Sequence, residues 1–429
     1  MNRSKTMNDS TTRRDLLKYA TLIAGGAIAG PGLLAACSSS GAGSGSDTFK
    51  IGAVLELSGP DSSGGQLAQR GYQFWVDTVN KAGGIKVGGK QYKVEMLSED
   101  CQSQPAVGAD AASRLITQKN VDALFGSYTS GVQLALNPIS AKYQVPCIAG
   151  SAESPKSWAA HPAYAYGIIP SVDLTADKAL KLIVDTGTPK PKSVAILGAN
   201  EPFSKDAAAG FAKGAQEAGL QITHNSLFPP TADLSPIVSS IASENPDIVA
   251  VGGHDTILIN FVKACKAIGY SPKALIMHYG VTEPAFVEAL KQDAEGVLGL
   301  VDWTPDFAYK DDVFGTAQDF AKNYRAKYNT DPDYTGAGCS VSGEVLQLAL
   351  AKLGKGPGLA QGDRVKLNQI IAQTDIKTFY GSIKFDASGD HFHDNTIPPP
   401  LLVQIQQGKL VAVAPADTKK GDLIYPRKA

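Results

Sequence analysis

The sequence predicts an α/β protein built as two doubly wound parallel-sheet lobes. Short apolar segments of strand character alternate with amphipathic helical segments along most of the chain, and this alternation is typical of parallel sheets covered by helices on both faces. A chain of 429 residues with 43% hydrophobic content is long enough to bury two cores. The series is interrupted near Ile168-Ile169-Pro170-Ser171, so we expect one lobe on each side of that break.

The first 36 residues have the features of an export signal. Basic residues precede an apolar stretch from Ala20 to Leu34, which is interrupted by Gly and Pro. A membrane-spanning helix needs about 20 largely apolar residues, and this stretch is too short for one. Thr12 to Lys18 resembles a twin-arginine export motif, and Leu34-Ala35-Ala36-Cys37 resembles a bacterial lipobox. We therefore expect cleavage after residue 36, lipidation of Cys37, and a flexible Gly/Ser tether through residue 47 that holds the protein at the extracytoplasmic face of the cell membrane.

The first lobe is expected to begin with a strand that ends in the turn Ser58-Gly59-Pro60. The helix after Pro105 has one apolar face, because apolar residues recur every fourth position from Val107 to Leu115. The expected strands are Lys50 to Leu57, Gln91 to Ser98, Ala123 to Phe125 and Val145 to Ala149, and the expected helices run from about Gln66 to Ala82, after Pro105, and after Ser130.

The second series repeats this pattern. Ser235-Pro236 opens one of its helices, because proline suits a first helical turn. The expected strands are Lys192 to Leu197, Leu220 to Phe228, Asp247 to Val251, Ala274 to Met277 and Gly296 to Val301, with helices at Phe203 to Ala218, after Ser235, at Thr256 to Ile268 and at Pro284 to Leu290. Two further helices, around Phe314 to Tyr328 and Val341 to Leu353, and a hairpin of Leu401 to Ile405 with Leu410 to Val413, complete the chain.

The stretch from Val121 to Pro155 gives the strongest indication of a binding site. Four hydroxyl residues, Ser127 to Ser130, lie between a buried strand and a helix, where free N–H groups and the helix dipole favour a carboxylate. The alternative is an ordinary helix N-cap at Thr129 or Ser130. A second polar turn, Gly150 to Ser154, follows the next strand, and turns at the carboxyl ends of neighbouring strands can converge on one ligand.

The composition and the motifs of the sequence exclude several classes of function. The chain has 40 basic and 41 acidic residues and no basic patch rich in aromatics, so we do not expect nucleic acid as a partner. The stretch Gly84 to Gln91 lacks the Ser/Thr of a P-loop, and Gly338 to Ser342 misses the last glycine of a nucleophile elbow. We interpret His391-Phe392-His393-Asp394 as a solvated hinge loop and expect neither a metal nor a cofactor, and no enzyme activity.

Four cysteines besides Cys37 would lie in an oxidising compartment. Our candidate disulfide joins Cys101 to Cys147, with four buried thiols as the equal alternative.

The chain resembles the extracytoplasmic solute-binding proteins of ABC importers, of the branched-chain (Leu/Ile/Val) amino acid type, with the type I periplasmic-binding-protein fold. The resemblance covers Phe49 to Ala414 and rests on the order and spacing of several motifs. These are Ile51-Gly52-Ala53-Val54 with Leu57-Ser58-Gly59-Pro60, Ala82-Gly83-Gly84-Ile85, Gly126-Ser127-Tyr128-Thr129-Ser130, Asn245-Pro246-Asp247, and Phe379-Tyr380-Gly381 with Phe385-Asp386 and Gly389.

The resemblance implies two lobes joined by three crossovers, near Pro170, near Val301-Asp302-Trp303 and between Tyr380 and Pro400. The lobes would comprise residues 48–170 with 304–380 and residues 171–303 with 381–429, closing over a ligand that contacts both. In the family pattern, hydroxyls at the positions of Thr129 and Ser130 bind the ligand carboxylate, and the positions of Ala152 and Glu153 face its ammonium group. The full set of expected ligand-binding residues is Ser58, Tyr128, Thr129, Ser130, Ala152, Glu153, Phe203, His254, Tyr279 and Trp303.

Several of these positions have a structural alternative. Glu153 replaces the usual hydroxyl residue and is either a partner for the ammonium or an exposed loop charge. Phe203 could be a helix core residue, His254 a neighbour of an N-cap, and Trp303 a packing residue of the hinge. The family's lid aromatic is missing after Ser58-Gly59-Pro60, and no lobe-two carboxylate for the ammonium is evident, which disfavours leucine, isoleucine or valine as the ligand.

The sequence thus predicts a monomeric, lipid-anchored binding protein that delivers a small carboxylate-bearing solute, an amino acid or derivative, to an ABC permease. Polar amino acids, short amides and aromatic carboxylates remain open as ligands. A sensor of the same fold that reports to a signalling partner is the alternative function.

Overall fold

The computed structural model describes residues 47–397, 400–416 and 418–427. The predicted export signal with its twin-arginine motif and lipobox, the lipidated Cys37 and the tether up to residue 46 lie outside these residues. Among the helices of the described ranges, none is both long enough and apolar enough to cross a membrane.

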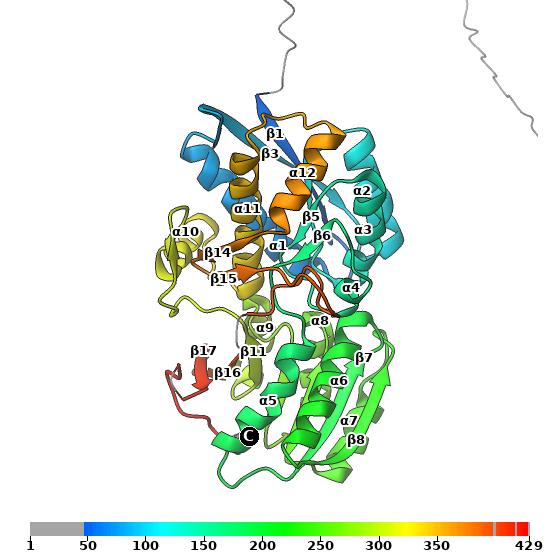
Figure 1. Ribbon diagram of the computed structural model, residues 1–429. Helices are drawn as coiled ribbons and strands as arrows, with labels where there is room; N and C mark the ends of the chain where they lie inside the picture. Colours follow the sequence, from blue (N-terminus) through cyan, green and yellow to red (C-terminus); the bar gives the residue numbers. More distant parts are fainter. Residues whose placement is uncertain (1–46, 398–399, 417, 428–429) are drawn as a thin grey trace, which may run out of the picture. The chain divides into compact units, whose positions relative to one another are not determined.

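The first lobe is built on a six-stranded sheet with the strand order β2-β3-β1-β4-β5-β6, parallel except for the β2–β3 hairpin (Figure 1). Its strands are β1 (Thr48–Leu55), β2 (Ile85–Val87), β3 (Lys90–Asp100), β4 (Ala123–Phe125), β5 (Cys147–Ala149) and β6 (Ala165–Gly167). Its helices are α1 (Ser62–Lys81), α2 (Pro105–Thr117), α3 (Ser130–Tyr143), α4 (Lys156–Ala159), α10 (Ala317–Tyr328), α11 (Tyr334–Leu353) and α12 (Gln361–Ile371).

Helices cover both faces of this sheet, because successive residues of a strand point to opposite sides. In β1, Ile51 and Ala53 join the core shared with α1 and α11, whereas Val54 joins the core beneath α2 and α3. Strands buried on both faces read as continuous apolar runs, which is how β4 and β5 were found in the sequence.

The second lobe has a seven-stranded sheet with the order β17-β16-β11-β10-β9-β7-β8, of which β7 to β11 are parallel. Its strands are β7 (Ser193–Ala199), β8 (Gln221–Phe228), β9 (Ile248–Gly252), β10 (Leu275–His278), β11 (Leu298–Val301), β16 (Leu401–Gln406) and β17 (Lys409–Ala414). The helices are α5 (Asp173–Thr186), α6 (Pro202–Glu217), α7 (Ser235–Glu244), α8 (Asp255–Ala267), α9 (Pro284–Leu290) and the 3₁₀ helix η1 (Lys291–Ala294). Here too the residues of β7 alternate between two cores, Val194 toward α5 and α6 and Ala195 toward α7 and α8.

The predicted fold class is therefore confirmed, with most elements within a few residues of the expected bounds. α11 differs, because it begins at Tyr334 and not at Val341. Several elements were not predicted, namely β2, β6, α4, α5, η1 and α12 and the short hairpins β12 (Lys310–Asp311) with β13 (Gly315–Thr316) and β14 (Asp375–Thr378) with β15 (Gly381–Lys384).

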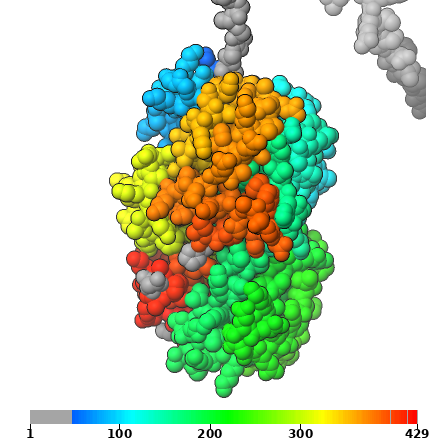
Figure 2. All heavy atoms as spheres, viewed as in Figure 1, coloured from blue at the N-terminus to red at the C-terminus, as the bar shows by residue number. Residues whose placement is uncertain are grey.

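The chain passes between the two sheets three times. It leaves β6 for α5, leaves β11 toward α10, and returns from β15 to β16. The first and third crossings are tied together, since the backbone N–H and hydroxyl of Ser171 donate to Asp394 at 3.1 and 2.6 Å. On the face shown in Figure 2, residues of the third crossing, coloured orange to red, fill the boundary above the green second lobe.

The sequence motif His391 to Asp394 lies in the third crossing, but the expectation of a solvated loop is wrong. His393 and Asp394 are buried, with the His393 ring stacked on Tyr166 at 4.2 Å between centroids. Burial lowers the pKa of His393 to about 4, so this ring is neutral at physiological pH. Within the described ranges, no three His, Cys, Asp or Glu side chains are grouped in a way that could hold a metal ion.

The candidate disulfide is also absent. Cys101, Cys147, Cys265 and Cys339 are all free and buried. Cys101 follows the carboxyl end of β3, while Cys147 opens β5, and β1 and β4 lie between these two strands. Three strand spacings of about 4.8 Å already exceed the reach of a disulfide, whose Cα atoms lie at most about 7 Å apart. The four cysteines are thiols of the apolar cores, as in the alternative interpretation.

Candidate functional site

The candidate site lies where the carboxyl ends of the two parallel sheets meet. In the first lobe, β1, β4 and β5 lead into Glu56, the turn at Ser127 to Ser130 and the turn at Gly150 to Ser154. In the second lobe, polar or aromatic residues follow β7, β9, β10 and β11. These residues are Phe203, His254, Tyr279, Asp302 and Trp303.

Hydrogen bonds join the lobes directly at one side of this cleft. The Glu283 carboxylate of the second lobe accepts from the hydroxyls of Tyr128 at 3.1 Å and Ser63 at 3.2 Å. The hydroxyl of Thr256, at the start of α8, donates to the Pro60 carbonyl at 3.2 Å. Burial, with repulsion from neighbouring carboxylates, raises the pKa of Glu283 well above its ordinary value.

Glu153 forms a second contact between the lobes. Its carboxylate is 3.1 Å from Nε2 of His278, at the end of β10, and accepts a hydrogen bond of 2.9 Å from the hydroxyl of Tyr334 on α11. The side chain is only 3% exposed. The interpretation of Glu153 as an exposed loop charge is therefore wrong, and this carboxylate is part of the cleft.

Aromatic rings from both lobes line the cleft between these two contacts. The rings form a chain in which Tyr128 of the first lobe contacts His254 at 5.2 Å and Tyr279 at 5.7 Å between centroids. Phe203 stacks on His254 at 5.0 Å, and Tyr279 meets Tyr334 edge to face at 5.0 Å. The structure thus brings together three predicted second-lobe residues with one predicted first-lobe residue.

His254 lies among carboxylates. Its Nδ1 is 3.3 Å from the Tyr128 hydroxyl, and Nε2 is 3.8 Å from Glu201. Burial opposes protonation of the ring, but attraction to Glu201, Asp61 and Asp255 outweighs it and raises the pKa.

The helix end predicted to hold a ligand carboxylate holds a carboxylate of the protein. Glu56 accepts from the N–H groups of Tyr128 and Thr129, both at 3.0 Å, and from the Thr129 hydroxyl at 2.7 Å. Thr129 is also the N-cap of α3 and accepts from Val132 N–H at 3.4 Å. Burial raises the pKa of Glu56, and the hydrogen bonds from Thr129 only partly oppose this. The expected role of Thr129 toward a ligand stays a prediction.

Ser130 is placed differently. Its Oγ accepts from the N–H groups of Glu153 at 3.2 Å and Ser154 at 3.0 Å, which ties the two polar turns together and leaves the hydroxyl hydrogen available. Ala152 is buried in the same turn. Ser58 lies outside this group, because it is exposed and its hydroxyl donates to Asp100 at 2.6 Å.

Trp303 packs in the hinge and borders the site. Its indole N–H donates to the Phe379 carbonyl at 3.1 Å, and its ring is stacked parallel to Tyr380 at 6.3 Å. The neighbouring Asp302 is buried and faces Glu153 closely enough for the two negative charges to repel.

Sequence reasoning missed several members of this cluster. Asp302 and His278 stand at or just past strand ends, so the rule that found Tyr279 could have found them. Glu56 directly follows β1, and in the sequence it looks like an ordinary strand residue. The remaining residues reach the cleft only through tertiary contacts, which leave no local sequence signal. The missed residues are Glu56, His278, Glu283, Asp302, Asp333, Tyr334 and Tyr380.

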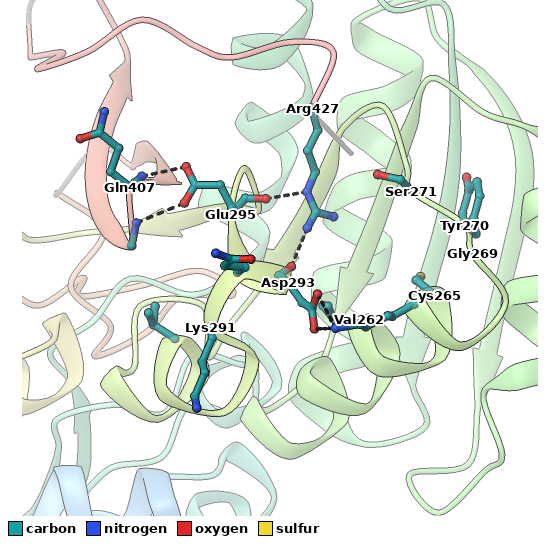
Figure 3. Close-up of a pocket in the computed structure, with 14 residues that line it drawn as sticks. Val262, Cys265, Gly269, Tyr270, Ser271, Lys291, Asp293, Glu295, Gln407 and Arg427 are labelled. Carbon is teal, nitrogen blue, oxygen red and sulfur yellow. Dashed lines mark hydrogen bonds and ion pairs between the residues drawn. The ribbon is translucent and has the colours of Figure 1, made fainter.

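A separate hollow of about 880 Å³ lies on the second lobe (Figure 3). It is lined by the second half of α8, by η1, by the β16–β17 turn and by Arg427, at the amino ends of the strands. Its charged groups are largely paired with one another. Arg427 donates to the Glu295 carbonyl at 2.6 Å, Lys266 to Asp293 at 2.6 Å, and the Gln407 N–H to the Glu295 carboxylate at 2.7 Å. Because ligands of such sheets bind at the carboxyl ends of strands, the cleft is the better candidate.

Comparison with known proteins identifies the family of this chain. A family model described as periplasmic binding protein matches residues 48–409. The chain belongs to the periplasmic binding protein family. The members of this family are solute-binding proteins, and the resemblance noted in the sequence is confirmed.

Relatives of this periplasmic binding protein agree in length and fold. The "Leu/Ile/Val-binding protein homolog 7" of Brucella abortus (strain 2308) is 24% identical over 397 residues, covering 90% of this chain and 96% of the relative. The crystal structure of the branched-chain amino acid transporter substrate-binding protein LivJ from Streptococcus pneumoniae, in complex with isoleucine, matches with a TM-score of 0.74 and 23% identity over 88% of this chain and 100% of that one. An ABC transporter solute-binding protein from R. palustris in complex with benzoate matches with a TM-score of 0.73 and 20% identity, covering 89% and 98%. These likenesses establish the type I fold.

Proposed function

We propose that this protein is the extracytoplasmic substrate-binding component of an ABC importer. It binds a small carboxylate-bearing solute, an amino acid or derivative, between its lobes and delivers it to a permease. The observation that carries this proposal is the buried polar and aromatic cluster, which draws Tyr128 and Glu153 from one lobe and His254, His278 and Tyr279 from the other. A ligand that contacts both lobes favours the closed arrangement, which is how such a protein signals occupancy to a permease.

The relatives support a small organic solute. One structural neighbour holds isoleucine and another holds benzoate, both of which carry a carboxylate. In the present chain, Ser130 is the first-lobe residue best placed for a ligand carboxylate, because its hydroxyl hydrogen is not used by the two N–H groups that it accepts. The start of α3 adds its dipole to that position.

A thermal-shift screen over amino acids, amides, ureas and aromatic acids tests this function, because a ligand that binds only the native state raises the melting temperature. With a solute identified, we expect Ser130→Ala to weaken its binding by about 1–3 kcal/mol in calorimetry, the cost of losing a charge-assisted hydrogen bond. Ser113→Ala is the control, since that hydroxyl bonds only within α2. Unchanged affinity in Ser130→Ala would remove this turn from the site.

We also propose that the protein is anchored to the membrane through a lipid on Cys37. Replacing Cys37 with Ser removes the thiol to which the lipid would be attached, and we expect the protein to move from the membrane to the soluble fraction on cell fractionation. Persistent membrane association of this variant would contradict the lipobox interpretation. Uptake of labelled solute into vesicles that contain the cognate permease separates import from the alternative role as a sensor.

A further inference from the structure

Asp302 is a buried carboxylate whose oxygens lack a hydrogen-bond partner in the described part of the chain. It follows β11, where the chain leaves the second lobe, and is 1% exposed. Burying a carboxylate is costly unless it is paired or hydrogen-bonded. The other carboxylates of the cleft meet this requirement, since Glu153, Glu283 and Asp333 each accept from at least one side-chain donor. Asp302 differs from the cleft residue Asp255 in that both of its oxygens, and not one, are without a partner among the described residues, so it is the cleft carboxylate that most needs an external donor.

The groups that face Asp302 do not supply that donor. Glu153 and Asp394 repel it, and Lys178 on α5 attracts it, but the Lys178 side chain is exposed and forms no ion pair with Asp302. Tyr334 of α11 faces it with a hydroxyl that already donates to Glu153.

Tyr380, from the turn between β14 and β15, is the remaining residue that surrounds Asp302. Its buried hydroxyl has no partner among the described residues, and Asp302 acts on it electrostatically. The Tyr380 ring is stacked parallel to the ring of Trp303, the residue that follows Asp302 in the sequence.

Part of the opposite pole of the cleft is occupied by the protein itself. The N–H groups of Tyr128 and Thr129 and the Thr129 hydroxyl, which together could hold a ligand anion, are taken by Glu56. Among the described residues, the cleft thus holds more buried carboxyl groups than buried basic side chains, the latter being His254 and His278.

We propose that the solute of this protein carries a net positive charge, and that its protonated amine binds between Asp302 and the Tyr380 hydroxyl. An ammonium group has three N–H donors, enough for both acceptors, and aromatic rings such as Trp303 and Tyr380 favour a cation nearby. This inference rests on the proposed function and narrows its ligand class to basic amino acids and related amines.

A proton released from Asp302 when the cation binds would be a second measurable consequence of this inference. Burial, with repulsion from Glu153, raises the pKa of Asp302 well above its ordinary value in the ligand-free protein. A bound cation favours the ionised form and lowers that pKa, so binding should release a proton and should tighten as pH rises.

The test is calorimetry on the full-length chain at neutral pH, in two buffers that differ in heat of ionisation. L-ornithine is the cationic probe, with L-leucine as the neutral probe and benzoate as the anionic one. We expect ornithine to bind at least about tenfold more tightly than either, a difference of about 1.4 kcal/mol, and to release a proton. Asp302→Asn should weaken ornithine binding at least about tenfold and abolish the proton release.

Glu344→Gln is the matched control. Glu344 is also buried, has one unpartnered oxygen and has a pKa raised to about 9 by burial, but its charged neighbours are Asp311 and Asp312 and not the cleft residues. This variant should leave affinity and proton release unchanged. Asp302→Asn replaces the carboxyl by an amide of the same shape, so it should fold, and proton release by the wild type is measured without any variant.

The outcomes separate the inference from the proposed function. Preferred binding of leucine or benzoate, or ornithine binding without proton release and unaffected by Asp302→Asn, would overturn the inference and leave the importer role standing. Failure of every compound in the broader screen to bind would instead count against the proposed function itself.

Discussion

At the scale of single residues, Thr129 shows how one side chain can satisfy two interpretations at once. The sequence offered a ligand contact or a plain helix cap, and the structure shows a cap whose hydroxyl also holds the buried Glu56. The N–H groups of Tyr128 and Thr129, just before α3, bind a carboxylate, and that carboxylate is Glu56 from the end of β1. The helix cap is thus confirmed, while a contact of Thr129 with a ligand stays a prediction.

This arrangement predicts a stability effect at Thr129. We expect Thr129→Ala to lower the free energy of unfolding by about 2 kcal/mol, because it removes an N-cap and leaves a buried carboxylate without its hydroxyl donor. Thr129→Ser keeps both hydrogen bonds and should cost clearly less. Urea denaturation of the ligand-free variants measures both values. Equal losses in the two variants would show that the methyl group and not the hydroxyl is what matters.

Strand ends were the most informative positions for single residues. The rule that ligands lie at the carboxyl ends of parallel strands selected Phe203, His254 and Tyr279, and the structure places all three in one cluster with Tyr128. It could not select Tyr334 or Tyr380, which come from a helix and a hairpin turn far along the chain and reach the cleft only through the fold.

At the scale of elements, prediction followed local signals and failed where tertiary contacts decide. Strands β4 and β9 and helices α6 and α9 have continuous apolar runs or proline at their first turn, and they were located within one or two residues.

Helix α11 shows the opposite case. Its first turns contain Gly336 and Gly338, and glycine costs about 1 kcal/mol per residue in a helix interior, so propensity placed the start seven residues late. The structure explains the glycines by close packing. A Cβ at Gly338 would lie 2.5 Å from the Gly150 carbonyl oxygen, so the helix start packs tightly against the polar turn after β5. A contact between residues so far apart in sequence leaves no local pattern.

At the scale of the whole molecule, a charged network that the sequence did not reveal joins the first and third crossings. His391 of the third crossing lies 3.3 Å from Asp173 at the start of α5 and 3.4 Å from Asp394. Asp394 in turn accepts from Ser171 of the first crossing. An imidazolium here would link the segment that enters the second lobe to the one that returns to it.

This network predicts how stability depends on pH. The nearby carboxylates of Asp173 and Asp394 raise the pKa of His391 to about 10, above the value of about 6.5 expected in the unfolded chain. A group whose pKa is raised on folding binds its proton more tightly in the native state. Its stabilising contribution is therefore complete below about pH 6.5 and is lost as pH rises toward 10. We expect His391→Gln to lower the melting temperature at pH 6.5 and to converge on the wild type near pH 10.

The neighbouring His393 is the matched control. Its pKa is lowered to about 4, so it stays neutral from pH 6.5 to 10, and His393→Gln should shift the melting temperature by a similar amount throughout that range. Differential scanning fluorimetry of the two variants and the wild type across this pH window measures the melting temperatures. Lys and Tyr side chains titrate alike in all three proteins, so they do not affect the differences between them. A pH-independent difference for His391→Gln would mean that the ring is neutral in the hinge and that the crossings are held by Ser171 and Asp394 alone.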